Sequence, residues 1–476
     1  MRKRSPWQPR LADGTANAAE RLMQAMSEDI FEGRLTSGDR LPAHRDLAWK
    51  LGISVGTVTK AYAMLGRQGL TRSVKGRGTF VATRAARSGP RIDLSINTPP
   101  AMIGERLLAR TLTTIAHKID TAHLNLYAPL AGHEEHRRLL ARWLETFSLA
   151  VDPRQVIPTA GAQQAVSLAF DFACGLDGVI LTERLTYPGA IALARHRGYR
   201  LRGIELDEEG MMPDALAATL DEEASVPYRA VYVTPTLHNP TTATMGRARR
   251  QTIVEICRRR NAVIIEDGVY ATDIDPGLLP LAALSPEHVV HVASLSKTLG
   301  PGLRIGALTL PPGMEERAEA FLRALPIGPS PLSMSVMEDW LVNGVVASVR
   351  QAIGIETRRR TALAASLLGQ ETCHVHPAAL HAWLPMSRSK AEQFALTASA
   401  LGVMVTAPDS VVVDPDDQAT GIRLCLGGPS PDDLKRALVV LADLIVSSDP
   451  YRLSPQSGRR SADGSAASST PGVHKY

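Results

Sequence analysis

The chain has 476 residues, 44% of them hydrophobic, which is enough to bury the cores of more than one domain. Its four cysteines, at positions 174, 257, 373 and 425, are widely spaced, which argues against a disulfide framework or a structural zinc site. The basic N-terminus lacks the apolar segment of a signal peptide, and no uncharged apolar run reaches the ~18 residues of a membrane helix. We therefore expect a cytoplasmic protein with no membrane partner.

Charge is unevenly distributed along the chain. Residues 1–83 hold 14 Lys and Arg against 7 Asp and Glu, whereas the remainder is slightly acidic, since the whole chain carries +5. A small basic module preceding a nearly neutral body is expected to meet a polyanion such as DNA. A solvated basic face is the alternative, and charge alone does not separate the two.

The basic module is predicted to begin with a basic tail at residues 1–16, followed by a succession of short helices and strands. Apolar spacing predicts helices over 17–32, 44–52 and 54–69, with Ser54 as the N-cap of the third. Two strands around a glycine turn follow, within residues 70–83. This order is that of a mostly α winged helix-turn-helix domain over 17–83. The polar segment 84–94, which contains Gly-Pro, is predicted to be a linker.

In such a domain the second helix of the pair enters the major groove, and the wing contacts the backbone or minor groove. Val58, Tyr62 and Leu65 form the apolar face of that helix, so the hydroxyls and the lysine beside them fall on or near its outer face. The candidate DNA-binding residues are Arg45, Ser54, Thr57, Thr59, Lys60, Lys75 and Arg77.

Residues 41–81, "LPAHRDLAWKLGISVGTVTKAYAMLGRQGLTRSVKGRGTFV", resemble the GntR-type DNA-binding domain. Many members of that family carry an arginine after the capping serine, where this chain has Val55, so a DNA contact is in doubt at this position. The resemblance implies double-stranded operator DNA as a partner. A helical hairpin that binds protein is the alternative.

From about residue 95 helical stretches alternate with short apolar strands, predicted at 178–183, 201–206, 230–235, 262–268, 289–296 and 304–310. Near-continuous apolar strands between helices imply an α/β domain with a mixed, mostly parallel sheet covered by helices on both faces. We assign it to residues 95–447. Residues 448–476, rich in Ser, Gly and Ala towards the C-terminus, are predicted to be a disordered tail.

Lys297 stands between two serines in "ASLSKTLGPGLRIG", just after a predicted strand. A surface or salt-bridged lysine is the commoner outcome. The sharper hypothesis is a lysine that holds pyridoxal 5'-phosphate as a Schiff base, which requires an anion cradle for the phosphate. The candidates for this cradle are Gly161, Ala162, Gln163, Ser294, Ser296 and Arg304.

The ring of the cofactor needs partners for its nitrogen, its phenolate oxygen and its face. Candidates for each lie at or just after predicted strand ends. Asp267 is placed to hold the ring nitrogen protonated, and Asn239 and Tyr270 are donors of the right type for its phenolate oxygen. Tyr187 is placed to stack on the ring. Each also has a structural alternative: a helix cap for Asp267, a turn for Asn239 and a core position for Tyr187. Their joint order favours the cofactor site.

The motifs "TAGAQQA", "TYPGA", "TPTLHNPTT", "EDGVY", "SLSKTLGPGLRIG" and "GIRLCLG" resemble class I and II aminotransferases of fold type I. The resemblance implies that Lys297 is the catalytic lysine and that Arg423 binds a substrate carboxylate. It also implies that Tyr127 reaches the phosphate of a neighbouring subunit, hence a homodimer. One departure is Thr242, where the enzymes usually have glycine. A GntR head joined to such a domain is the layout of the MocR subfamily of transcriptional regulators.

Two functions follow from this layout. The first is a pyridoxal-phosphate-dependent transcriptional regulator that senses an amino acid, an amine or the cofactor itself through aldimine chemistry at Lys297. The second is an active aminotransferase with an appended DNA-binding head. The identity of the effector, the operator and the sign of regulation stay open. We expect no metal site, since His374, His376 and His381 lack supporting ligands apart from Cys373 and favour solvent or packing roles.

Overall fold

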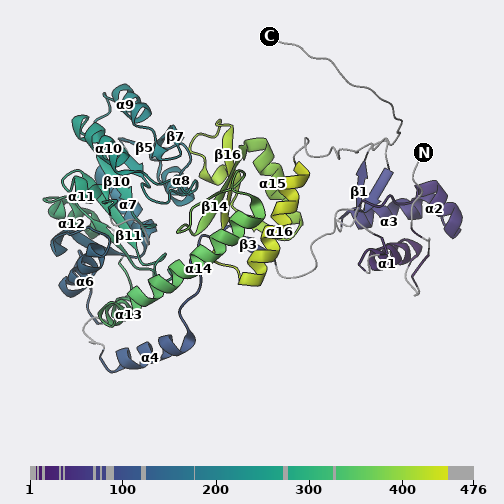
Figure 1. The fold of residues 1–476 in the computed structure, drawn as a ribbon, viewed down its shortest axis with the longest axis horizontal. Coiled ribbons are helices and arrows are strands. Elements are labelled where there is room, and N and C mark those ends of the chain that lie inside the picture. The colour runs from purple at the N-terminus through teal and green to yellow at the C-terminus, as the bar shows by residue number, and fades with distance from the viewer. Residues whose placement is uncertain are drawn as a thin grey trace, which may run out of the picture.

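The structure is a computed structural model in which residues 7, 10–12, 17–31, 34–35, 38–67, 71–74, 78–81, 91–118, 125–175, 177–271, 277–324 and 328–448 are described. Figure 1 shows a small N-terminal unit, here called the head, and a larger body built of two lobes. None of the helices in the described ranges is long and apolar enough to cross a membrane.

The head contains the predicted three helices and two-stranded ribbon (Figure 1). Its elements are α1 (Ala18–Phe31), α2 (His44–Leu51), α3 (Val55–Arg67), β1 (Thr71–Val74) and β2 (Gly78–Val81), with the two strands antiparallel. The predicted inner face of α3 is confirmed, because Val58, Tyr62 and Leu65 are all buried in the core of the head. Gly52 ends α2 in the left-handed conformation that glycine adopts readily, which lets the chain turn into α3.

The N-terminal segment differs from the predicted basic tail. Trp7 is only 6% exposed and packs into the core of the head, and Ala12 is also buried. The Trp7 indole donates to Asp29 of α1 at 2.5 Å, and Arg10 forms an ion pair with the same carboxylate at 2.7 Å. The apolar residues among the basic ones therefore make the described part of residues 7–12 an integral piece of the head.

The larger lobe is built on a seven-stranded sheet in the order β4-β12-β11-β10-β9-β5-β6. All neighbours are parallel except at β12, which runs antiparallel to both β11 and β4. The strands are β4 (Val156–Thr159), β5 (Val179–Glu183), β6 (Arg200–Ile204), β9 (Arg229–Val233), β10 (Val263–Asp267), β11 (Val289–Ser294) and β12 (Gly306–Thr309). The six predicted strands are confirmed. β4 was not predicted, because four residues that include a proline carry little periodic signal.

Helices cover both faces of this sheet, as its apolar strands require, and a hydrophobic core lies on each side. One core is formed with α7 (Ala162–Ala173), α8 (Pro188–Arg197) and α12 (Glu315–Ala324). The other is formed with α6 (Glu134–Glu145), α9 (Pro213–Glu222), α10 (Arg247–Arg259), α11 (Leu281–Leu284) and α13 (Pro331–Val342). The doubly covered, mostly parallel sheet matches the predicted fold class.

The smaller lobe has its own core around a three-stranded sheet, β13-β14-β16. Its elements are α14 (Val345–Leu368), β13 (His374–Val375), β14 (His381–Ser387), α15 (Arg388–Ala400), β15 (Val403–Val405), β16 (Ala419–Cys425) and α16 (Pro431–Ser448). α14 joins it to the larger lobe (Figure 1). Of the predicted disordered tail, Ser448 ends α16, and residues 449–476 lie outside the described residues.

The predicted linker is too long at its C-terminal end. Residues Ile92–Leu94 form β3, which pairs in parallel with β15 of the smaller lobe, and Leu94 is fully buried there. Three residues separated from their partner strand by some 300 positions give no local signal of pairing. The remaining elements are α4 (Glu105–Ala116), β7 (Leu206–Asp207), β8 (Gly210–Met211) and the short 3-10 turns η1 (Pro153–Gln155), η2 (Pro301–Leu303) and η3 (Pro408–Val411).

Candidate functional site

The predicted cofactor residues lie at one edge of the seven-stranded sheet. Asp267 ends β10, Lys297 follows β11, and Asn239 follows β9. Gly161 and Tyr187 are the N-caps of α7 and α8, directly after β4 and shortly after β5. Because β12 is antiparallel to its neighbours, Arg304 at its start lies at the same edge as their carboxyl ends. Open α/β sheets bind ligands at this edge.

Lys297 is half-buried beside the ring of Tyr270. Its Nζ lies 5.5 Å from the centroid of that ring and donates to the backbone oxygen of Asn97. Burial lowers the pKa of Lys297 to about 8, and the nearby positive charges of Arg423 and Arg304 act in the same direction. A lysine with a pKa near 8 is partly neutral under physiological conditions, as a nucleophilic amine must be.

The hydroxyl of Tyr270 is held by two side-chain amides. Asn97 Nδ2 and Asn239 Nδ2 each lie 3.1 Å from Tyr270 Oη, and an amide nitrogen can only donate. Both lone pairs of the hydroxyl oxygen are therefore filled. The Tyr270 proton is left for another acceptor, which suits the phenolate oxygen of pyridoxal phosphate.

Arg423 of β16 is 6% exposed, yet no acidic side chain among the described residues pairs with it. Its guanidinium donates to Asn239 Oδ1 at 2.7 Å, to Thr406 Oγ1 at 3.2 Å and to the Ser95 carbonyl at 3.1 Å. All three acceptors are neutral, and two of its five N–H groups remain. A buried cation without a counter-charge is costly, so this position favours a ligand that brings a carboxylate.

Asp267 is fully enclosed at the end of β10. Its carboxylate accepts hydrogen bonds from the Tyr232 hydroxyl at 2.6 Å and from the Val269 amide at 3.2 Å. Burial raises the pKa of Asp267, whereas these two donors and the nearby Lys297 oppose the rise. A protonated pyridine nitrogen would supply the counter-charge that this buried carboxylate needs.

The anion cradle is built around Gly161, which caps α7 with φ +85° and ψ 170°. A Cβ at this position would lie 2.8 Å from Arg304 Nη2, so only glycine allows the arginine to approach. The amides of Ala162 and Gln163 open α7 and have no backbone acceptor within the described chain. Two free amides, a helix N-terminus and an exposed guanidinium suit a phosphate group.

Two predicted cradle residues, Gly161 and Ser294, differ in detail from the sequence-based expectation. The Gly161 amide is already used, since it donates to the Thr159 carbonyl at 2.8 Å. The Ser294 hydroxyl donates to the Ile305 carbonyl at 3.0 Å and accepts from the Ser296 amide, so Ser294 holds the loop in place and offers no proton to a ligand. Ser296 itself is half-buried and closer to the predicted role.

Tyr187 is half-buried, and its hydroxyl donates to Gln163 Oε1 at 3.0 Å. Burial raises the pKa of Tyr187, Asp267 acts in the same direction, and Arg423 and Arg304 oppose the rise. The structure thus brings the predicted residues together from both ends. Their chemistry, which combines an amine, a carboxylate, a phenol and an anion cradle, fits pyridoxal phosphate.

Comparison with known families agrees with this geometry. Residues 90–441 match the family of class I and II aminotransferases, and residues 18–81 match the bacterial regulatory proteins of the gntR family. The chain belongs to the class I and II aminotransferase family. Because a GntR head precedes the family's domain, the architecture is that of the MocR-type regulators, and the cofactor of the family domain is pyridoxal phosphate.

Two relatives that are named as transcriptional regulators match most of the chain. The HTH-type transcriptional regulator YdeF of Bacillus subtilis is 26% identical over 450 residues, which cover 92% of this chain and 96% of that protein. The HTH-type pyridoxine biosynthesis transcriptional regulator PdxR of Corynebacterium glutamicum is 26% identical over 367 residues, 73% and 78% of the two chains.

Solved structures place the fold of the body among aminotransferases. An archaeal alanine:glyoxylate aminotransferase superposes with a TM-score of 0.69 at 21% identity, over 83% of this chain and 95% of that one. The kynurenine aminotransferase of Pyrococcus horikoshii gives a TM-score of 0.66 at 21% identity, over 76% and 92%. At this identity the comparison concerns the fold alone.

The match to the gntR family implies that the head binds DNA, and the structure describes most of the residues predicted to contact it. Ser54 caps α3, because its hydroxyl accepts from the Thr57 amide at 3.0 Å. Arg45 and Lys60 are exposed, whereas the Thr59 hydroxyl donates to the Val55 carbonyl at 3.0 Å. Lys75 and Arg77, predicted at the wing tip, lie outside the described residues.

Sequence reasoning missed two residues beside Tyr270. Asn97 was assigned from the sequence only to the beginning of the large domain, and no motif marks it as a functional residue. His381 was considered only with His374 and His376, but those two are exposed whereas His381 is buried against Asn97 and Tyr270. Within the described ranges no group of three or more metal-ligating side chains is found.

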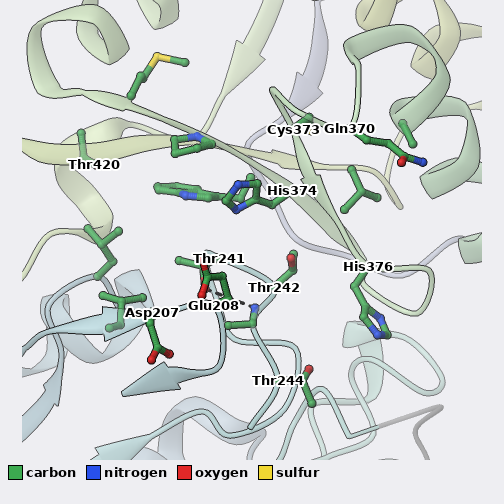
Figure 2. Close-up of a pocket in the computed structure, with 18 of the residues that line it drawn as sticks. Asp207, Glu208, Thr241, Thr242, Thr244, Gln370, Cys373, His374, His376 and Thr420 are labelled. Carbon is green, nitrogen blue, oxygen red and sulfur yellow. Dashed lines mark hydrogen bonds between the residues drawn. The ribbon is translucent and has the colours of Figure 1, made fainter. Parts of the chain in front are cut away.

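A second cavity, of about 1410 Å³, opens between the two lobes. Figure 2 shows Thr241 and Thr242, from the loop after β9, on one side and Cys373 and His374 on the other. None of the described residues that line it is a predicted cofactor ligand. Thr242 has φ +68°, a conformation that glycine adopts more easily than threonine, which fits the glycine expected at this position from the resemblance.

Proposed function

We propose that the protein is a pyridoxal-phosphate-dependent transcriptional regulator whose body senses an amino acid. The observation that carries the proposal is Arg423, a buried guanidinium that has only neutral partners among the described residues and shares Asn239 with the Tyr270 site. It offers a place for a carboxylate on the same network as Lys297. The GntR head gives such recognition an output on DNA.

Two ends of the site recognise two different groups of the ligand, its carboxylate and its amine. Arg423 keeps two N–H groups for a carboxylate, while Lys297 supplies the amine that holds the cofactor. When bound, pyridoxal phosphate supplies a carbonyl that condenses reversibly with amines. A ligand with both an amine and a carboxylate therefore engages both ends. Regulation further requires that the ligand bind two states of the protein with different affinity.

The first experiment tests the cofactor. Adding pyridoxal phosphate to the full chain should produce a visible absorption band that Lys297→Ala abolishes. No band with the wild-type protein would overturn the proposal.

The second experiment tests sensing. Amino acids should change the affinity of the protein for its upstream DNA, and Arg423→Met should weaken the response to carboxylate-bearing ligands about 10- to 100-fold, because a charge-assisted pair is worth roughly 1.5–3 kcal/mol. Simple amines that lack a carboxylate should lose far less of their effect in Arg423→Met, because they form no ion pair with Arg423. The same preparation should show no multiple-turnover transamination. Turnover without any effect on DNA binding would favour the alternative, an aminotransferase with an appended head.

We further propose that the working form is a homodimer. Tyr127 is fully exposed at 103%, and Leu108 and Leu112 lie exposed one helical turn apart on α4. Exposed apolar side chains of this kind mark contact surfaces between subunits, and an exposed tyrosine is suited to reach a neighbouring subunit's phosphate site. The expected result is a dimer in solution whose affinity for pyridoxal phosphate falls in Tyr127→Phe. A monomer that binds the cofactor with full affinity would contradict this.

A further inference from the structure

A series of hydrogen bonds, in which each donor and acceptor is fixed by its chemistry, connects His381 of β14 to Tyr270. His381 Nε2 lies 3.2 Å from the His238 carbonyl, which can only accept, so Nε2 carries a proton. Burial, reinforced by the nearby Arg423, lowers the pKa of His381 to about 3, so its ring is neutral. A neutral imidazole holds one N–H, and Nδ1 of His381 is therefore an acceptor.

This acceptor fixes the orientation of the Asn97 amide. Asn97 Nδ2 lies 3.2 Å from His381 Nδ1 and 3.1 Å from Tyr270 Oη, so its two protons go to these two atoms. The reversed amide would set Oδ1 against the lone pair of His381 Nδ1. Asn97 Oδ1 itself is buried and has no hydrogen-bond partner in the described part of the chain, so the orientation is imposed by His381 and Tyr270.

A second amide, that of Asn239, donates to the same hydroxyl. Arg423 Nη1 donates to Asn239 Oδ1 at 2.7 Å, which turns Asn239 Nδ2 towards Tyr270 Oη. Since both lone pairs of Tyr270 Oη accept hydrogen bonds, its O–H bond must point in a third direction. The orientation of this proton thus depends on a residue that does not itself hydrogen-bond to the hydroxyl.

We propose that His381 is a positioning residue: by orienting Asn97 it keeps the Tyr270 hydroxyl a donor towards the phenolate oxygen of pyridoxal phosphate. This inference rests on the proposed function, because it concerns the protein with its cofactor at Lys297. A donor at the phenolate oxygen stabilises the negative charge there. It thereby weakens the hold of that oxygen on the proton carried by the nitrogen that joins the cofactor to Lys297.

The measurable consequence is the pH at which the visible band of the loaded protein titrates. Losing the directed Tyr270 proton should raise this midpoint. The charged or titratable groups that act on Lys297 are Asp267, Arg423, Arg304 and the Cys425 thiol, and a change at His381 or Asn97 replaces none of them. A shift of the midpoint in these variants therefore reports on the hydroxyl.

The experiment compares pH titrations of the visible band in the full chain loaded with pyridoxal phosphate. His381→Leu and Asn97→Leu should each raise the midpoint by about one pH unit, equivalent to about 1.4 kcal/mol. The double variant should shift no further than Asn97→Leu alone, because His381 acts through Asn97. His381→Gln keeps one acceptor and one donor and should titrate close to wild type. Leu384→Val, in the same strand but in the core of the smaller lobe, is the control and should not shift.

The outcomes separate this inference from the proposed function. If wild type gives no visible band, the cofactor proposal fails and the inference falls with it. If wild type gives the band and His381→Leu titrates as wild type does, only the role of His381 is overturned. Additive shifts in the double variant would also overturn it, since they would mean that His381 acts directly, through its ring contact with Tyr270 at 5.7 Å. Asn97→Leu, which leaves His381 in place, carries the test if His381→Leu does not fold.

Discussion

Replacing Gly161 with alanine should damage the cofactor site in two ways that can be measured apart. Its backbone, at φ +85° and ψ 170°, lies in a region that is essentially restricted to glycine, so alanine costs about 1–3 kcal/mol of folding free energy. The new Cβ would also lie 2.8 Å from Nη2 and 3.0 Å from Cζ of Arg304. The guanidinium must move away, and the phosphate loses a charge-assisted hydrogen bond worth roughly 1.5–3 kcal/mol.

The expected result is a 10- to 100-fold loss of affinity for pyridoxal phosphate, read from titration of the visible band, together with a lower free energy of unfolding. Gly344→Ala is the matched control, because Gly344 has φ +71° but nothing within 4 Å of an added Cβ. It should lower the free energy of unfolding and leave cofactor affinity unchanged. If Gly161→Ala loses stability but binds the cofactor as wild type does, the cradle has been placed wrongly.

Four further results are expected. Since the pKa of Lys297 is lowered to about 8, the rate of cofactor capture followed by stopped-flow absorbance should rise with pH and level off above about 8, and a rate still rising at pH 10 would contradict this. Over the interval from about 8 to 10.5 the unfolded chain holds the proton that the folded state gives up, so the cofactor-free protein should gain stability with rising pH. Arg45→Ala and Lys60→Ala should each reduce the slope of log K against log salt for DNA binding by about 0.9, and Lys50→Ala in α2 serves as the control, whose slope should not change. Thr242→Gly should raise the Tm, because threonine at φ +68° carries about 1–2 kcal/mol of strain, and a lower Tm would argue against strain at this turn.

The location of the candidate cofactor site could be predicted because several of its residues lie at strand ends that are visible in the sequence. Asp267 closes an apolar run, and Lys297 and Asn239 follow such runs closely. Parallel strands bring their carboxyl ends to one edge of the sheet. Residues that follow different strands in the sequence are therefore expected to be neighbours in space. Arg304 reaches that edge for the opposite reason, since its strand runs antiparallel.

Other features depend on contacts between distant segments and left no local signal. β3 pairs with a strand of the smaller lobe, and the Trp7 side chain packs into the head from a segment that looks like a basic tail. The Asn97–His381 contact joins residues 284 positions apart. The Ser294 hydroxyl has the right residue type for a phosphate ligand, but the fold gives its proton to the Ile305 carbonyl. Residue type indicates which groups are available, and only the fold decides which partner each group binds.

The hydrogen bonds around Tyr270 also connect the two ends of the ligand site. Arg423 donates to Asn239, and Asn239 donates to the hydroxyl that faces the cofactor, so the carboxylate end and the phenolate end are two bonds apart. A carboxylate that draws on Arg423 competes with Asn239 Oδ1 for the same guanidinium, and any weakening of that bond releases the Asn239 amide from its fixed orientation. Under the proposed function, a carboxylate bound at Arg423 would therefore alter the orientation of the Tyr270 proton before any chemistry at Lys297. A sensor needs this kind of link between recognition and cofactor state, and in this chain it requires no residue beyond those that bind the ligand.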